Sequence, residues 1–204
     1  IEEIRRAGVK AAVSSTPQDA IRFGDIARES GVDFFFIQST VTSARHVSSS
    51  YESLNLAAFC GKYPAPVVIG NCVSYRVGMD LMESGAAGVL VGVGPGAACT
   101  TRGVTGIGVP QVTATLEVAH ARNDYMESTG RYVAVITDGG MRVGGDIAKA
   151  FASGADAVML GSPFAGTDEA PGGGYHWGMA TSHSALPRGT RIRVGVNGTL
   201  KQIL

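Results

Sequence analysis

Residues 83–99 read ESGAAGVLVGVGPGAAC, and the order of residue types in this stretch decides the kind of fold that the chain can adopt. Gly85 marks the end of a helical segment, because a glycine just past a helix takes the left-handed conformation at little cost. An apolar strand, expected over 87–93, follows at once and leads into a glycine-rich loop. A helix, a short turn and a buried strand are the repeating unit of parallel α/β sheets.

The same order recurs along the chain. Glycines at positions 8, 31, 130 and 154 also end helical stretches, and a strand is expected within a few residues of each. The predicted strands are Lys10–Ser14, Asp33–Gln38, Ala65–Gly70, Ala87–Val93, Arg131–Thr137 and Asp156–Leu160. They are apolar almost throughout rather than alternating, which indicates burial on both faces and hence a parallel sheet covered by helices.

Alternating strands and helices form either a doubly wound open sheet or a (β/α)8 barrel. Polar and glycine-rich residues follow nearly every strand, as on a barrel rim, whereas an open sheet would gather them at one switch point. We therefore predict an α/β fold, a TIM barrel of which residues 1–204 supply about strands 3–8 as one catalytic domain. We expect the N-terminal βα units and a C-terminal segment to be missing. A C-terminal hairpin is expected, with Arg191–Val196 and Thr199–Ile203 flanking the turn Asn197-Gly198.

Composition excludes several classes of partner. Of the 204 residues, 45% are hydrophobic, and 17 basic residues balance 17 acidic ones. This balance argues against nucleic acid or an acidic membrane surface as a partner, and no apolar run is long enough to span a bilayer. The three cysteines, Cys60, Cys72 and Cys99, are odd in number and unrelated in spacing. We expect reduced thiols and a cytoplasmic protein.

The longest stretch for which no regular structure is expected runs from Gly92 to Pro110, and such a loop within a compact domain is usually functional. Its six glycines let backbone groups approach a ligand or an ion closely. Cys99 lies in this loop near Arg102, a cation that would favour the nucleophilic thiolate. Its context supports a nucleophile and a small packed side chain equally, whereas Cys60 and Cys72 are interpreted as structural.

Two glycine-rich sites follow the last two predicted strands, Asp138-Gly139-Gly140 and Gly161-Ser162. In barrels the loops after the last two strands often hold a phosphate through backbone N–H groups. Asp138 could accept hydrogen bonds from ribose hydroxyls, or it could be an ordinary turn aspartate. The coincidence of the two sites favours a nucleotide ligand, and the four histidines show no metal-binding spacing.

Residues 92–111, GVGPGAACTTRGVTGIGVPQ, closely resemble the signature loop of the inosine monophosphate (IMP) dehydrogenase and guanosine monophosphate (GMP) reductase family. The resemblance continues through DGG at 138–140, GGDIAKA at 144–150, GADAVMLGS at 154–162 and AGTDEAPG at 165–172. It is strongest to the bacterial branch that lacks the regulatory domain pair.

This resemblance implies a purine nucleotide oxidoreductase. Cys99 would attack C2 of IMP, NAD would take the hydride, and water would release xanthosine monophosphate (XMP). A GMP reductase that uses NADPH is the alternative within enzymes. A purine-nucleotide-binding protein without turnover is the alternative in another class.

The resemblance also implies roles for individual residues. The implied catalytic residues are Cys99 and Thr101. The implied substrate contacts are Asp138, Gly139, Gly140, Gly161, Ser162, His176, Gly178, Met179 and Arg188. The implied cofactor contacts are Gln38, Ser39, Asn71, Gly92, Val93 and Gly94. A potassium ion on the backbone carbonyls of Gly94, Gly96 and Cys99, and a homotetramer, are implied as well.

Four positions depart from the family's pattern. Ala97 stands where the dehydrogenases usually have a phosphate-binding Ser, and His176 stands in place of a phosphate-binding Tyr. Gln38 stands where an Asp usually contacts the nicotinamide ribose. Arg188 stands where a Glu or Gln reads the purine edge.

Two segments bear on the direction of the reaction. The loop Gly103–Gly106 is dehydrogenase-like, because the reductases tend to carry basic residues there. The flap, reduced to about Ala180–Leu186, lacks the Arg-Tyr pair that activates water in dehydrogenases. This second feature favours the reductase, since reduction needs no water step.

Overall fold

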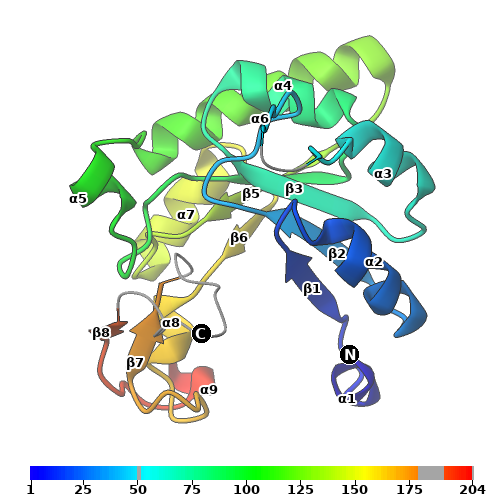
Figure 1. Cartoon of the computed structure of the whole chain (residues 1–204). Coiled ribbons are helices and arrows are strands. Elements are labelled where there is room, and N and C mark those ends of the chain that lie inside the picture. The colour runs from blue at the N-terminus through cyan, green and yellow to red at the C-terminus, as the bar shows by residue number, and fades with distance from the viewer. Residues whose placement is uncertain (50–51, 179–190, 204) are drawn as a thin grey trace.

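The computed structural model of the chain describes residues 1–49, 52–178 and 191–203. Six parallel strands form one curled sheet in the order β1-β2-β3-β4-β5-β6 (Figure 1). These strands are β1 (Ala12–Ser15), β2 (Phe34–Gln38), β3 (Val67–Cys72), β4 (Gly88–Val91), β5 (Ala134–Asp138) and β6 (Ala157–Met159). Sequence order and spatial order coincide, as in a barrel, so the predicted incomplete barrel is confirmed as a curled half-barrel.

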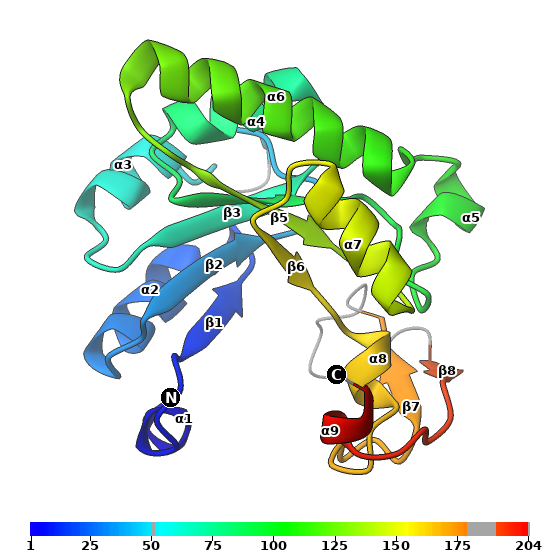
Figure 2. The ribbon, with the colours of Figure 1, turned by 180° about the vertical axis from the view of Figure 1, so that it is seen from behind.

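Helices alternate with the strands, and the larger ones lie along the outer, convex side of the sheet (Figures 1 and 2). The helices are α1 (Glu2–Arg6), α2 (Ala20–Glu29), α3 (Leu56–Lys62), α4 (Tyr75–Glu83), α5 (Thr101–Thr105), α6 (Gln111–Thr129), α7 (Gly144–Ala152), α8 (Ser162–Ala165) and α9 (Leu200–Ile203). None of the helices in the described part of the chain is long and apolar enough to cross a membrane.

The core lies between the sheet and this outer layer of helices. Phe35 of β2 is fully buried, and its ring centroid lies 5.7 Å from that of Phe59 and 5.0 Å from that of Tyr63. On α6 the apolar positions recur at helical spacing, and Val118 is fully buried against α4. Burial of such side chains stabilises the fold by about 1.5–3 kcal/mol each. The helices therefore cover the convex face of the half-barrel.

The segment after α8 leaves the sheet. Strand β7 (Tyr175–Trp177) pairs antiparallel with β8 (Arg191–Arg193), and both lie beside α8 at the carboxyl end of β6 (Figure 2). The predicted hairpin around Asn197-Gly198 is wrong, because Thr199 precedes a short helix, α9, instead of a strand. The backbone N–H of Asn197 donates to Gly166 O, and Gln202 Oε1 accepts from the N–H of Thr199. These bonds replace the cross-strand ladder that the turn would have needed.

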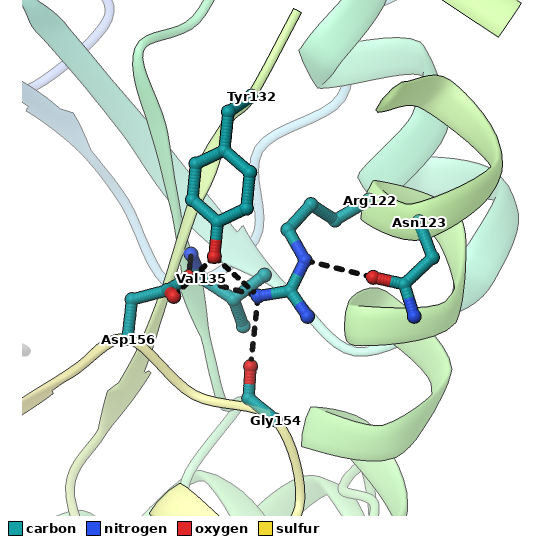
Figure 3. Close-up of polar contacts among 6 residues, drawn as sticks. All are labelled: Arg122, Asn123, Tyr132, Val135, Gly154 and Asp156. Carbon is teal, nitrogen blue, oxygen red and sulfur yellow. Dashed lines mark hydrogen bonds and ion pairs between the residues drawn. The ribbon is translucent and has the colours of Figure 1, made fainter. Parts of the chain in front are cut away.

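A polar cluster ties the amino ends of β5 and β6 to α6 (Figure 3). The Asp156 carboxylate accepts from the backbone N–H of Val135 at 2.8 Å and from Arg122 Nη1 at 3.0 Å. The hydroxyl of Tyr132 donates to the same carboxylate. The cluster lies at the end of the strands opposite to the glycine-rich loops, so it is an element of the scaffold.

Candidate active site

The carboxyl ends of parallel strands meet at one edge of the sheet, and the residues singled out in the sequence converge there. Strands β2, β3, β4 and β5 are neighbours, and they end at Gln38, Cys72, Val91 and Asp138. At the end of β3 the register shifts between Gly70 and Cys72, which leaves Asn71 outside the regular pairing with β4. In TIM barrels this edge carries the active site.

Two amides and one carboxylate form a buried network at this edge. Asn71 Nδ2 donates to Asp138 Oδ2 at 2.7 Å and to Gly92 O at 2.8 Å. Gln38 Nε2 donates to Asp138 Oδ2 at 3.1 Å and to Asn71 Oδ1 at 3.3 Å. Gln38 and Asn71 are only 7% and 5% exposed. The predicted cofactor contacts and the predicted ribose contact therefore belong to one network.

The environment of Asp138 favours its neutral form. Burial raises the pKa of this carboxyl above its ordinary value, and the hydrogen bonds from Asn71 and Gln38 lower it by less than burial raises it. Both amide donors bind Oδ2, so Oδ1 accepts no hydrogen bond from the described chain. Oδ1 can accept from a ligand hydroxyl, which fits the ribose contact expected for Asp138.

Gly92 and Gln111 hold the ends of β4 and β5 together. Gln111 Nε2 donates to Val91 O at 2.6 Å and to Asp138 O at 3.1 Å. Gly92 has φ +137°, and a Cβ on it would lie 2.6 Å from both Asp138 O and Gln111 Nε2. Only glycine fits this position. Gln111 was not among the predicted site residues, although its place directly after Pro110 at the start of a helix is a signal in the sequence.

The cysteine loop packs against the turn after β5. A Cβ on Gly140 would lie 2.9 Å from Pro95 O, and one on Gly139 would lie 3.5 Å from Gly96 N. Cys99 N–H donates to Gly96 O at 3.0 Å, which closes a turn and leaves Cys99 partly exposed. The thiol loop and the predicted phosphate-binding turn are therefore in direct contact.

Within this loop, the Cys99 thiol donates to Thr101 Oγ1 at 3.2 Å, so the two predicted catalytic residues are hydrogen-bonded. No regular structure was predicted between Gly92 and Pro110, but Thr101 opens the short helix α5. The hydrogen bonds that the structure describes for Arg102 go to backbone carbonyls and not to the thiol. Its Nε donates to Val93 O at 3.1 Å and its Nη2 to Val109 O at 2.6 Å, so it fastens the two ends of the loop.

The loop after β6 brings a serine and a histidine together. Ser162 Oγ and His176 Nδ1 lie 2.9 Å apart. A Cβ on Gly161 would lie 3.0 Å from His176 Cε1 and Nε2, so the imidazole rests on the backbone of Gly161. Gly178 follows β7 directly. Two other predicted substrate contacts, Met179 and Arg188, lie outside the described residues, as does the predicted flap.

The remaining predicted contacts lie on the same rim. Ser39 follows β2, its N–H donates to Gly70 O at 2.9 Å, and its hydroxyl donates to Val41 O at 2.7 Å. Val93 is 2% exposed and its carbonyl accepts from Arg102 Nε, so the structure buries this predicted cofactor contact. Among the three carbonyls predicted to hold potassium, that of Gly96 accepts from Cys99 N–H. Those of Gly94 and Cys99 accept no hydrogen bond from the described chain.

Two cavities differ in their relation to this rim. The larger, about 490 Å³, lies between α2 and α3, away from the glycine-rich loops. A smaller cavity of about 280 Å³ is bordered by Pro95, Gly139, Gly140 and Gln111. The smaller cavity is therefore the one that borders the candidate site.

The two other cysteines are held in their thiol forms. Burial raises the pKa of Cys60 to about 11 and that of Cys72 to about 12. Neither thiol is a good nucleophile at neutral pH, because the thiolate is the reactive form. Cys99 is the cysteine of the glycine-rich loop, and it is partly exposed whereas Cys72 is buried.

The thiol-bearing glycine-rich loop packs on a glycine turn at the carboxyl edge of the curled parallel sheet, which is the edge where TIM barrels carry their functional sites. The sequence model of the IMP dehydrogenase / GMP reductase domain matches residues 2–184. The chain belongs to this family.

Individual relatives agree with this assignment. An uncharacterized oxidoreductase of Mycolicibacterium smegmatis is 44% identical over 208 residues, which cover 100% of this chain and 56% of the relative. The inosine-5'-monophosphate dehydrogenase of Pasteurella multocida is 44% identical over 172 residues, covering 84% of this chain and 33% of the relative. The chain therefore spans about half the length of the uncharacterized oxidoreductase of Mycolicibacterium smegmatis.

A solved structure has the same fold over the whole chain. The crystal structure of an IMP dehydrogenase/GMP reductase-like protein from Corynebacterium glutamicum superposes with a TM-score of 0.89 at 39% identity. The match covers 100% of this chain and 53% of that protein. The half-barrel is therefore a shape that exists within a larger chain of the family.

Proposed function

We propose that the protein is an NAD-dependent oxidoreductase that converts IMP to XMP through a covalent bond to Cys99. The observation that carries the proposal is the contact between the Cys99 loop and the Asp138–Gly140 turn. It brings a thiol, a carboxylate oxygen free to bind a ribose, and the backbone N–H of Gly140, which donates to no group of the described chain, to one rim. A purine nucleoside monophosphate presents the three matching parts: an electrophilic base carbon, a ribose and a phosphate.

In the proposed reaction the Cys99 thiol loses its proton and its sulfur adds to C2 of the purine. The hydrogen on C2 leaves with its electron pair, and the base stays on the sulfur as a thioimidate. Water then adds to C2, and the C–S bond breaks to release XMP and the thiol. Bound NAD supplies the hydride acceptor. Thr101, 3.2 Å from the sulfur, is placed to accept the thiol proton in a hydrogen bond and orient the sulfur.

The residues present fit a nicotinamide cofactor at the ends of β2 and β3. Both N–H groups of the Gln38 amide are used by Asp138 and Asn71, which leaves its Oε1 as the acceptor of this side chain. A ribose hydroxyl can therefore donate to Gln38 Oε1. The amide also donates from Nε2 to Asp138 Oδ2 at 3.1 Å, a bond that an ionised carboxylate at position 38 could not donate.

Potassium is part of the same proposal. The carbonyl oxygens of Gly94 and Cys99 are free to bind a cation, and that of Gly96 keeps a second lone pair beside its bond to Cys99 N–H. The cation would fix the turn that carries the thiol. We further propose that the full protein acts in the cytoplasm as a homotetramer, with no membrane or nucleic acid partner.

GMP reduction with NADPH is the second candidate. The observation that favours it is the absence of an Arg-Tyr pair between residues 180 and 186 of the sequence, because reduction requires no activated water. A nucleotide-binding protein without turnover is the third candidate.

The deciding experiment incubates the full-length protein with IMP plus NAD, and separately with GMP plus NADPH, and follows the absorbance of the reduced cofactor. We expect NADH to appear in the first mixture. Cys99→Ser should abolish turnover and retain nucleotide binding, and iodoacetamide should label Cys99 but neither Cys60 nor Cys72. Turnover in Cys99→Ser, or labelling of Cys99 that IMP does not slow, would refute the thiol mechanism.

A further inference from the structure

We propose that Gln38 is a positioning residue for the substrate: its amide holds the Asp138 carboxylate in the orientation that binds the ribose hydroxyls. This inference rests on the proposed function, because it needs a ribose beside Asp138. It assigns a second task to a residue whose predicted role concerns the cofactor. The effect of Gln38 on IMP binding should therefore be present when no cofactor is bound.

The Asp138 carboxylate is held by two amides, one from β2 and one from β3. Gln38 Nε2 donates to Asp138 Oδ2 at 3.1 Å, and Asn71 Nδ2 donates to the same oxygen at 2.7 Å. Gln38 Nε2 also donates to Asn71 Oδ1 at 3.3 Å, so it orients the amide of Asn71 with the donor nitrogen toward the carboxylate. Both amides bind one oxygen of Asp138, which leaves the other, Oδ1, for a ligand.

The backbones that carry these side chains are fixed by bonds outside the network. The N–H of Ser39 donates to Gly70 O at 2.9 Å and the N–H of Asn71 donates to Ser39 O at 3.1 Å, so the ends of β2 and β3 are tied together. Gln111 Nε2 donates to Asp138 O at 3.1 Å, which holds the end of β5. Removal of the Gln38 amide should therefore free the side chain of Asp138 and leave the strand ends in place.

Neutral amides are the groups that the fold supplies to this carboxylate. Within the described ranges, Asp138 forms no ion pair with a lysine or arginine side chain. Burial raises the pKa of Asp138, and the hydrogen bonds from Asn71 and Gln38 act in the opposite direction. Gln38 therefore favours the ionised carboxylate, which is the stronger acceptor for ribose hydroxyls.

An acidic residue at position 38 could not take part in this network. An ionised carboxylate has no proton to donate to Asp138, and it would face Asp138 with a like charge. Gln38 stands where the family usually has an Asp, so it adds a hydrogen bond that an Asp could not donate. This bond links the end of β2, on the cofactor side, to the carboxylate of β5.

Two variants remove the donor, and a third is the matched control. Gln38→Met keeps the length of the side chain without its polar atoms, and Gln38→Glu keeps its shape but replaces the donor by an acceptor. Thr42→Val is the control, because it removes a buried hydrogen bond at the same edge of the sheet that does not involve Asp138. This bond runs from Thr42 Oγ1 to Gly70 O at 2.7 Å. Urea unfolding establishes that each variant is folded.

The test measures the affinity of the full-length protein for two ligands by calorimetry, with no NAD present. The ligands are IMP and 2′,3′-dideoxy-IMP, which lacks the hydroxyls that Asp138 would bind. Both Gln38 variants should lose about 10-fold in affinity for IMP. Their affinity for the dideoxy analogue should change by less than about 2-fold, as should the affinity of Thr42→Val for either ligand.

The outcomes separate this role from a general structural one and from the proposed function. Unchanged affinity of the Gln38 variants for IMP, or equal losses for IMP and the dideoxy analogue, overturns the role of Gln38. Equal affinity of the wild type for the two ligands overturns it as well, because Asp138 would then bind no ribose hydroxyl. In each of these cases, NADH formed by the wild type from IMP and NAD leaves the proposed function intact. Failure of the wild type to bind IMP, GMP or XMP overturns the proposed function, and the role of Gln38 falls with it.

Discussion

Arg122→Ala tests how the amino ends of the strands are held (Figure 3). Arg122 Nη1 lies 3.0 Å from Asp156 Oδ2, 3.0 Å from the Tyr132 hydroxyl and 3.1 Å from Gly154 O. Its guanidinium carbon also lies 5.2 Å from the centroid of the Tyr132 ring. One side chain therefore connects α6 with the segments that precede β5 and β6.

The size of the effect follows from burial. The Arg122 side chain is 11% exposed and that of Asp156 is 30% exposed, so water screens this ion pair only in part. Hydrogen bonds to charged groups contribute about 1.5–3 kcal/mol each when buried. Asp156 keeps its bonds from Tyr132 and Val135 in the variant, which limits the loss. We expect Arg122→Ala to lower the free energy of unfolding by about 2–3 kcal/mol.

Arg28→Ala is the matched control. Arg28 is 50% exposed, and its partner Asp25 is 62% exposed, so removal of this pair should change stability by about 0–1 kcal/mol. Urea unfolding, followed by circular dichroism, measures the free energy of unfolding of both variants. In thermal unfolding, the melting temperature of Arg122→Ala should fall by about 5–10 °C. Equal losses in the two variants would refute the argument. So would additive effects of Arg122→Ala and Tyr132→Phe in a double-mutant cycle.

Two further predictions concern the rim. Gly92→Ala should destabilise the chain by about 1–3 kcal/mol, because φ is +137° and the new Cβ would meet Asp138 O. The control, Gly103→Ala, should be neutral or stabilising, because no atom lies within 4 Å of the new Cβ. Unfolding curves in which Gly103→Ala is the less stable variant would contradict this. Asp138→Asn should match or exceed the wild type in stability at neutral pH yet bind IMP more weakly. The raised pKa of Asp138 means that its contribution to stability is present below the ordinary carboxyl pKa and is lost as pH rises through the raised one. The stability of Asp138→Asn relative to the wild type should therefore fall toward low pH, and a relative loss that instead grows as pH rises would reverse that sign.

The sequence alone determined the half-barrel. Apolar runs such as those before Gln38 and Gly92, each following a glycine at a helix end, are local signals, and all six predicted strands form in the predicted order. The cysteine loop was also identifiable, because its glycines and Cys99 are contiguous. Such features depend on residues within a few positions of each other, so they can be recognised without knowing which segments pack against them.

Tertiary structure decided how side chains are paired. Gln38 and Asp138 are 100 positions apart and Asn71 and Asp138 are 67 apart, so their shared network depends on the curl that brings strand ends together. Arg102 donates to two carbonyls of its own loop, because buried carbonyls require partners. Asn197-Gly198 precedes a helix because its backbone bonds to Gly166 and Asp168. Hydrogen bonds to a distant segment override the local preference of Asn-Gly for a hairpin turn. Only the folded chain shows which of these distant hydrogen bonds form.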